Sequence, residues 1–258
     1  MDAKTDAPHP PAYTRAVGAL ADLLRGANVC DSHGIKHALD VARLTERALA
    51  CCPRPLTGDE RLLRMLAALL HDADDRKFFP AHDDYQNARA VLRAAGLEAG
   101  AEARVIEMIG WVSTSTNGDR IPPAAAEDPS LLYPRWADRI AAVGWTGVWR
   151  CWKYTIGVER PLYTAETPRA LSEDDLWARI ATPERYAAYR GNSASMIDHY
   201  YDKLLHIGRF PTDNPFLEAE ARMRSRPLVD IALEFGRTGA LPEGLYDKAA
   251  SEAEKESA

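Results

Sequence analysis

The residues best suited to chemistry in this chain stand at the end of an apolar run. Residues 60–70 have the sequence ERLLRMLAALL, and His71 and Asp72 follow directly. A neutral imidazole and an ionised carboxylate are ligand types for divalent transition metals. Burying a polar group without a partner costs on the order of 2–7 kcal/mol. The pair therefore either binds something that compensates it or lies in a hydrated cleft.

Histidine also recurs earlier, near the start of a second predicted helix. His33 and His37 are four residues apart. The apolar positions that continue this spacing are Val41, Leu44 and Ala48. Side chains at such steps share one helix face, so both imidazoles should point where the core-facing residues point. A histidine at a helix start is more often a surface or hydrogen-bonded residue than a ligand, so the spacing alone leaves both interpretations open.

A third segment places an acid among apolar and small side chains. Asp138 lies between Trp136 and Ile140, with Ala137 and Ala141 beside it. Small neighbours would let another backbone or a ligand approach the carboxylate closely. A solvated loop would explain the charged residues that follow His71 and Asp72. It does not explain why an acid at position 138 lies among apolar residues.

The elements that must position these side chains are predicted to be helices. Helical periodicity covers residues 13–26, 57–70, 83–95, 101–112, 131–143, 145–156, 193–207 and 214–236, and a further helix ends near Cys52. Thr57 and Glu60 form a capping-box pattern, and Asp31-Ser32 offers an N-cap for the helix that carries His37. Alternating strand patterns are nearly absent. We expect one all-α domain over residues 12–240, with a surface excursion at 159–192 and disordered ends at 1–11 and 241–258.

Composition narrows the class of protein. The chain has 258 residues, 46 % of them hydrophobic and 27 % charged, and a formal net charge of −6. The negative charge argues against nucleic acid as a partner, but a small phosphorylated ligand needs only a few local cations. No apolar run is long enough for a membrane span, and the start of the chain lacks a signal-peptide core. Four cysteines without zinc-type spacing predict free thiols in a reducing compartment, so we expect a cytoplasmic protein.

Taken in order, His37, His71-Asp72 and Asp138 resemble the H…HD…D motif of the HD-domain metal-dependent phosphohydrolases. Four segments are similar to the branch of bacterial HD-domain nucleotide pyrophosphohydrolases and their uncharacterised relatives: SHGIKH at 32–37, HDADDRKF at 71–78, ADRI at 137–140 and HYYDKLL at 199–205. The resemblance spans roughly residues 12–236 and implies a single helical HD domain. The branch often has a second acid where this chain has Ala141, so no role is carried over for that acid.

The resemblance implies a divalent metal held by His37, His71, Asp72 and Asp138. Two imidazoles and two carboxylates leave about two of six positions for water or substrate. Mn²⁺ suits this set best, and Co²⁺, Fe²⁺, Ni²⁺ or Mg²⁺ would also fit. Asp75 is the first candidate for the catalytic base.

His33 is the second candidate base. Lys77 and Arg139 are candidates for phosphate contact, with Tyr201 and Lys203 as further contributors. Each of these residues could instead have a purely structural role. Asp75 and Lys77 could form an exposed ion pair, Arg139 could brace Asp138, and Tyr201 and Lys203 could simply pack their helix.

The expected activity is hydrolysis of a phosphoester or phosphoanhydride bond in a nucleotide or similar small metabolite by metal-activated water. One alternative is a non-catalytic, nucleotide-sensing HD module, against which the intact ligand set argues. Another is a di-iron HD-type oxygenase. That chemistry needs two further histidines between the HD pair and Asp138, and the interval contains only His82. No oligomeric state is predicted.

Overall fold

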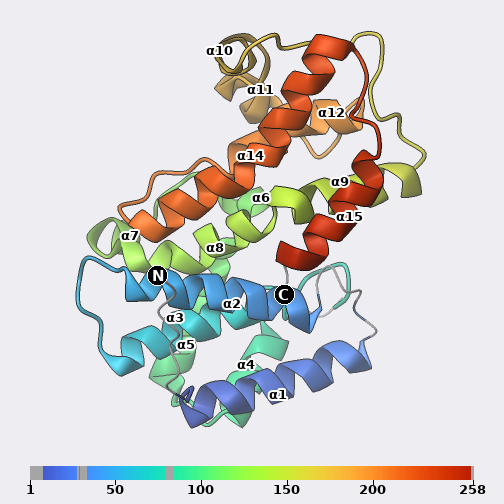
Figure 1. Ribbon diagram of the computed structural model, residues 1–258. Helices are drawn as coiled ribbons and strands as arrows, with labels where there is room; N and C mark the ends of the chain where they lie inside the picture. The colour runs from blue at the N-terminus through green and yellow to red at the C-terminus, as the bar shows by residue number, and fades with distance from the viewer. Residues whose placement is uncertain (1–7, 28, 30–33, 80–83, 257–258) are drawn as a thin grey trace. The chain divides into compact units, whose positions relative to one another are not determined.

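The computed structural model describes residues 8–27, 29, 34–79 and 84–256 (Figure 1). Over these residues every regular element is helical and no strand occurs. The prediction of an all-α protein is therefore confirmed. No helix in this described part combines the length and the low polarity that crossing a membrane requires.

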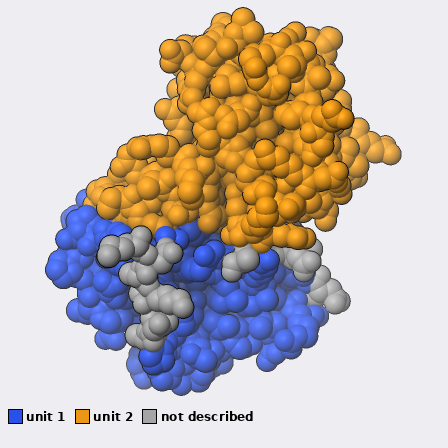
Figure 2. Space-filling view, viewed as in Figure 1, with its two compact units in different colours: residues 1–137 blue, residues 138–258 orange. Residues whose placement is uncertain are grey.

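Backbone contacts divide the chain into two compact units, residues 1–137 and 138–258 (Figure 2). The first unit contains α1 (Pro11–Gly26), α2 (Ile35–Ala50), α3 (Gly58–Leu70), α4 (Gln86–Ala94), α5 (Ala99–Val112), α6 (Thr114–Asn117), α7 (Pro123–Glu127) and a 3₁₀ turn (Pro129–Leu132). Helix α8 (Tyr133–Ala141) continues from the first unit into the second. Beside this division, one domain over 12–240 stays a prediction.

In the described residues, the second unit combines three helices of 12 to 24 residues with several short helices and turns. Its elements are α9 (Gly144–Gly157), α10 (Glu173–Asp175), a π-helical turn (Leu176–Ile180), α11 (Pro183–Ala188), α12 (Met196–His199), a second π-helical turn (Tyr200–Leu204), α13 (Leu205–Ile207), α14 (Pro215–Thr238) and α15 (Leu245–Glu256). Helices α14 and α15 both pack against α9.

Helices α2 and α3 pack against each other in the first unit. Both bury small side chains, each at most 4 % exposed: Ala38, Ala42, Ala67 and Ala68. Small residues in a helix contact favour close approach of the two axes. The packing of these two helices brings the first histidine of the motif toward the HD pair.

Helix α3 begins with the predicted capping box, which the structure confirms. Thr57 Oγ1 accepts a hydrogen bond from the Glu60 N–H at 3.2 Å, and a Glu60 carboxylate oxygen accepts one from the Thr57 N–H at 2.8 Å. The bond from the Thr57 backbone, followed by the bond from Arg54, lowers the pKa of Glu60 to about 2. The start of α3 is therefore fixed locally, and the helix ends at Leu70, immediately before His71.

The predicted N-cap of α2, Asp31-Ser32, lies outside the described residues. Helix α2 begins at Ile35 with Gly34 as its N-cap residue, so His37 lies in its first turn. The helix ends at Ala50, two residues before the predicted boundary at Cys52.

The segment predicted as a surface excursion, 159–192, contributes to the core of the second unit. Ala170, Leu176 and Ile180 are each at most 2 % exposed and belong to the same buried cluster as Phe235. The prediction of a surface excursion is therefore wrong for these three positions. The segment contains prolines and many charged residues, which are typical of surface loops. The sequence pattern therefore does not indicate that its apolar residues pack against distant helices.

The prediction of a disordered tail over 241–258 is corrected for residues 245–256, which form α15. Leu245, Ala249 and Ala253 recur every four residues and are buried. The Glu256 carboxylate accepts hydrogen bonds from the N–H groups of Trp145 and Thr146 at the start of α9, each at 2.9 Å. The sequence pattern does not indicate this helix for two reasons. Its buried alanines are only weakly hydrophobic, and Glu256 caps a helix that is remote in sequence.

Candidate metal centre

His37, His71 and Asp72 form a compact cluster in the first unit. One ligand atom from each lies within 4.8 Å of the other two. The Asp72 Oδ2 atom is 3.5 Å from His71 Nε2 and 3.8 Å from His37 Nε2. The two imidazole rings meet nearly edge to face, with centroids 5.1 Å apart and an interplanar angle of 70°. The packing of α2 on α3 and the end of α3 together create this cluster.

The position of His71 at the end of α3 also sets its tautomer. Its Nδ1 lies 2.8 Å from the carbonyl oxygen of Ala68. A carbonyl can only accept, so Nδ1 carries the proton and donates it, and this bond satisfies one of the carbonyls left unpaired at a helix C-terminus. The lone pair of a neutral His71 ring is then on Nε2, the nitrogen nearest Asp72. Such a backbone bond is a common way to orient a metal-ligating histidine.

The spacing of these donors fits a divalent metal ion. Ligand bonds of about 2.0–2.2 Å for imidazole nitrogen and carboxylate oxygen put neighbouring donors roughly 3–4 Å apart, as the measured separations are. The His71 side chain is 2 % exposed, whereas that of Asp72 is 28 % exposed. The cluster is thus anchored on its histidine side and reachable from solvent on its carboxylate side. In the described part of the chain, no other group of three metal-ligating side chains is this compact.

A series of tight turns follows the pair and carries Asp75 and Lys77. The Asp75 N–H donates to the Asp72 carbonyl at 3.1 Å. Asp75 Oδ1 accepts the Lys77 N–H at 2.9 Å, and Asp75 Oδ2 is 3.7 Å from Lys77 Nζ. The ion pair considered from the sequence is therefore present, with Lys77 well exposed. It does not exclude catalysis, because the same bonds fix the Asp75 carboxylate one turn from Asp72.

Asp74, for which the sequence pattern indicates no role, anchors this turn. Its two carboxylate oxygens accept the N–H groups of Asn87 and Ala88, each at 2.9 Å, at the start of α4. The Asn87 side-chain amide in turn donates to the Ala73 carbonyl at 3.0 Å. An acid at a helix N-terminus satisfies unpaired donors there. Asn87 is 13 residues from Asp74 in sequence, so no local capping pattern predicts that Asp74 caps α4.

The chain is similar to known proteins in both sequence and fold. The sequence matches no established family model. It is 32 % identical over 220 residues to the uncharacterized protein L803 of Acanthamoeba polyphaga mimivirus, covering 79 % of this chain and 88 % of that protein. An identity of this level over most of both chains places the two proteins in one family.

Solved structures share the fold. A Lactobacillus plantarum protein superposes with a TM-score of 0.60 at 23 % identity, over 88 % of this chain and 95 % of that one. An HD-superfamily hydrolase from Bacillus thuringiensis superposes with a TM-score of 0.59 at 17 % identity, over 88 % of this chain and 96 % of that one. The chain therefore has the fold of these proteins, one of which is described as an HD-superfamily hydrolase. The fold that the resemblance of the motifs implies is thereby confirmed.

Asp138 and Arg139 lie on α8, in the part of that helix that belongs to the second unit. Arg139 is buried, with 1 % exposure. The inclusion of Asp138 in the ligand set stays a prediction. So does the choice for Arg139 between phosphate contact and bracing of Asp138. His33 and His82 lie outside the described residues, so the role of His33 as second base also stays a prediction.

The other two predicted substrate contacts, Tyr201 and Lys203, lie on the π-helical turn of the second unit. Tyr201 is fully buried, and its hydroxyl donates to the Pro168 carbonyl at 3.2 Å. The ring of His206 donates from Nε2 to the Tyr201 carbonyl at 3.0 Å, where a π turn changes the regular bonding of the helix. These contacts agree with the packing role that the sequence left open, and substrate contact by either residue stays a prediction.

A partly buried polar network joins the HYYDKLL segment to the residues before it. Arg185 donates to both Asp198 and Asp202, at 2.7 and 2.5 Å. Ser193 also donates to Asp202, at 2.5 Å, and its hydroxyl is 3.4 Å from His199 Nδ1. Through Arg185, Asp198 and Asp202 thus hold α11 to α12 and to the π-helical turn. Three described cysteines, Cys51, Cys52 and Cys151, are free thiols, and Cys30 lies outside the described residues.

His199 makes the second unit sensitive to acid. Burial, and next the nearby Lys203 charge, lower the pKa of His199 to about 4 although Asp202 opposes the shift. The unfolded chain therefore binds a proton near pH 6.5 that the folded chain takes up only near pH 4. We expect the free energy of unfolding to fall by about 2 kcal/mol between pH 7 and pH 5 through this group.

Urea denaturation at both pH values tests this expectation. His199→Gln should have a smaller fall than the wild-type chain, because glutamine does not titrate. Equal falls in the two proteins would contradict the assignment to His199.

Proposed function

We propose that this protein is a metal-dependent phosphohydrolase acting on a nucleotide or a similar small phosphorylated metabolite. The observation that carries the proposal is the cluster of His37, His71 and Asp72, whose donors have the chemistry and spacing of a divalent-metal site. The Bacillus thuringiensis neighbour is described as an HD-superfamily hydrolase, and the shared fold supports the same class of reaction here. Manganese is the proposed ion.

A bound divalent cation would lower the pKa of a coordinated water and polarise a phosphoryl oxygen. The chain's own residues then have three tasks. His37, His71 and Asp72 hold the ion, with Asp138 proposed as the fourth ligand. Asp72 keeps part of its carboxylate open to solvent, which leaves a route for water and substrate to reach the cluster.

Asp75 is the proposed general base. Its carboxylate lies on the same run of turns as Asp72 and is 18 % exposed, so water can reach it. The bond from the Lys77 N–H to the Asp75 carboxylate, and the bond from the Asp75 N–H to the Asp72 carbonyl, fix the turn before substrate binds. A carboxylate positioned in this way can accept the proton that a nucleophilic water loses. His33 remains the second candidate for this task.

Cationic side chains would stabilise the charge on the phosphate. Lys77 is well exposed and adjacent to Asp75, so its ammonium can turn from that carboxylate toward an incoming phosphate. Arg139 and Lys203, with the Tyr201 hydroxyl, are proposed as further contacts. Hydrogen bonds between ionised partners are roughly twice as strong as neutral ones, so even one of these contacts would raise substrate affinity measurably.

We expect Asp75→Asn to lower kcat by about 100-fold or more and to leave the metal content unchanged. An amide cannot accept the proton, and general base catalysis contributes typically 10²–10⁴-fold. Steady-state kinetics and elemental analysis of the same preparation measure the two quantities. Asp22→Asn, an exposed acid on α1 paired with Arg25, is the matched control and should keep full activity. Parallel losses of kcat and metal would instead make Asp75 a ligand.

The proposed function itself is tested by phosphate release. Nucleoside mono-, di- and triphosphates are incubated with the protein and Mn²⁺, Co²⁺ or Mg²⁺, and both phosphate and pyrophosphate are measured. We expect release from at least one nucleotide class, dependent on the ion and stopped by a chelator. Nucleotide binding without release under any ion would contradict hydrolysis and favour the sensing function.

A further inference from the structure

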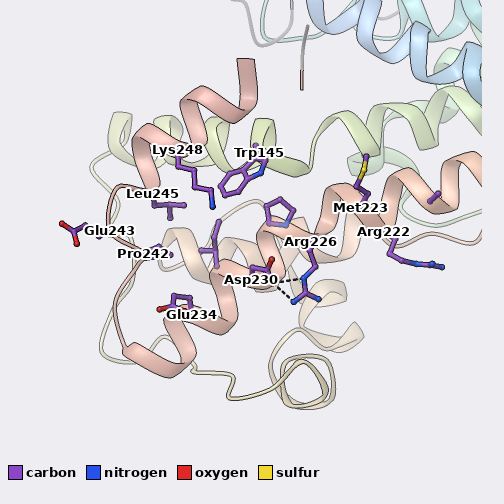
Figure 3. A pocket seen from close by; sticks show the side chains of 13 residues that line it. Trp145, Arg222, Met223, Arg226, Asp230, Glu234, Pro242, Glu243, Leu245 and Lys248 are labelled. Carbon is purple, nitrogen blue, oxygen red and sulfur yellow. Dashed lines mark hydrogen bonds and ion pairs between the residues drawn. The ribbon is translucent and has the colours of Figure 1, made fainter. Parts of the chain in front are cut away.

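The second unit contains a pocket that no predicted site residue lines. It encloses about 840 Å³ between α14, α15 and the segment that joins them (Figure 3). Its volume is in the range of about 300–1,000 Å³ that is typical of small-molecule sites. The apolar part of its wall includes Trp145, Met223, Ile231, Pro242 and Leu245. Seven of the thirteen lining residues are apolar, and the other six are charged.

Helix α15 completes this pocket, and its position is well determined by contacts. Leu245 is 2 % exposed, and the Tyr246 ring packs on Trp149 with centroids 4.8 Å apart. At the other end, Glu256 caps α9 through two hydrogen bonds of 2.9 Å. Gly144, at φ +78°, leaves the space that this carboxylate occupies. The pocket is therefore a built feature of the unit, since both of its helices are held by α9.

Most of the charges around the pocket are already neutralised by neighbours. Arg226 donates to Asp230 at 2.7 Å and to Glu173 at 2.9 Å. Glu234 is paired with Arg237, and Arg222 donates to Glu218 at 2.7 Å. These pairs give this wall no net preference for a cation or an anion.

Lys248 differs from the other charged residues of the wall. Its ammonium lies over the Trp145 ring, 4.7 Å from the ring centroid, and within the described ranges no carboxylate forms an ion pair with it. Figure 3 shows Lys248 and Trp145 directed toward each other, whereas Glu243 points away from the pocket. The charge that faces the apolar wall without a counterion is therefore positive.

We propose that this pocket binds a small organic anion with a flat apolar body, such as an aromatic carboxylate. The apolar body would lie against Ile231 and Leu245 beside Trp145, and the carboxylate would pair with Lys248. Burial of the flat body supplies most of the affinity, and the ammonium sets the preference for an anion. This binding site goes beyond the proposed hydrolase activity and requires no metal.

Three probes of one shape test the proposal by isothermal titration calorimetry at low salt. They are 2-naphthoate, 2-naphthamide and 2-naphthylmethylamine, which are anionic, neutral and cationic. We expect the carboxylate to bind about threefold to fivefold more tightly than the amide, as one partly exposed ion pair allows, and the amine to bind most weakly. The same order is expected in EDTA, because the metal site is not involved.

Two variants at exposed positions locate the site. Lys248→Gln should remove the preference, so that carboxylate and amide bind equally. Ala219→Trp places a large side chain in the pocket from α14 and should weaken all three probes at least tenfold. Lys255→Gln is the matched control on α15, where the lysine pairs with Glu252, and it should bind as the wild-type chain does.

Circular dichroism and thermal unfolding confirm that each variant is folded before it is titrated. Several outcomes would overturn the proposal: no binding of any probe, stronger binding of the amine, a carboxylate preference that survives Lys248→Gln, or unchanged binding by Ala219→Trp. Each points to a pocket without this ligand chemistry.

Discussion

Replacing His71 and Asp72 by alanine together is expected to abolish metal binding and to lower phosphate release by on the order of 1,000-fold or more. The variant removes two of the three clustered donors, and His37 alone cannot hold a divalent ion at a useful affinity. It also removes the bond from His71 Nδ1 to the Ala68 carbonyl. Loss of that bond costs about 1 kcal/mol, so the helices should remain folded.

Elemental analysis, circular dichroism and the phosphate-release assay measure the three expected effects on one preparation. The matched control is the double variant His9→Ala with Asp22→Ala, which removes a histidine and an acid from exposed positions of the same unit. It should retain both metal and activity. If the His71/Asp72 variant released phosphate at the wild-type rate, the metal centre would be wrongly placed.

Gly236→Ala is expected to destabilise the second unit by about 3 kcal/mol or more. A Cβ atom at this position would overlap the carbonyl oxygen of Ala170 and lie 2.7 Å from its carbonyl carbon. These are backbone atoms, so no side-chain rotation can relieve the contact. The Arg169 side chain donates to the Gly236 carbonyl at 2.8 Å, which holds the two segments at this separation.

Chemical denaturation of the wild-type and variant proteins measures the change. Gly157→Ala is the control in the same unit, because a Cβ at this helical position meets nothing within 4 Å. That variant should be as stable as the wild-type chain or slightly more so, since alanine favours a helix over glycine. A Gly236→Ala protein as stable as the control would mean that the 159–192 segment does not pack on α14 as described.

The parts of the structure that depend on local patterns could be predicted from the sequence. Thr57 and Glu60 announce the start of α3 because both partners of the capping box lie within four residues. The end of α3 at Leu70 could be predicted because apolar periodicity stops at His71. The resemblance to the HD-domain phosphohydrolases implies that His37, His71 and Asp72 share one cluster, and the structure brings these three together in the first unit.

The parts that depend on distant partners could not be predicted in this way. Glu256 caps the start of α9, 110 residues away in sequence. No local pattern indicates this contact, so the sequence predicts a disordered tail. Asp74 caps a helix that begins beyond its own motif. Ala170 and Gly236 meet through a backbone contact for which neither residue type provides a periodic signal. Such features arise from tertiary packing and become visible only in three dimensions.

The most direct test of the metal centre is a crystal structure of the protein grown with Mn²⁺, with anomalous diffraction data. We predict an anomalous peak about 2.2 Å from His37 Nε2, His71 Nε2 and an Asp72 carboxylate oxygen, and a fourth protein ligand at Asp138. Manganese bound at another place, or no peak within ligand distance of these three side chains, would contradict the assignment.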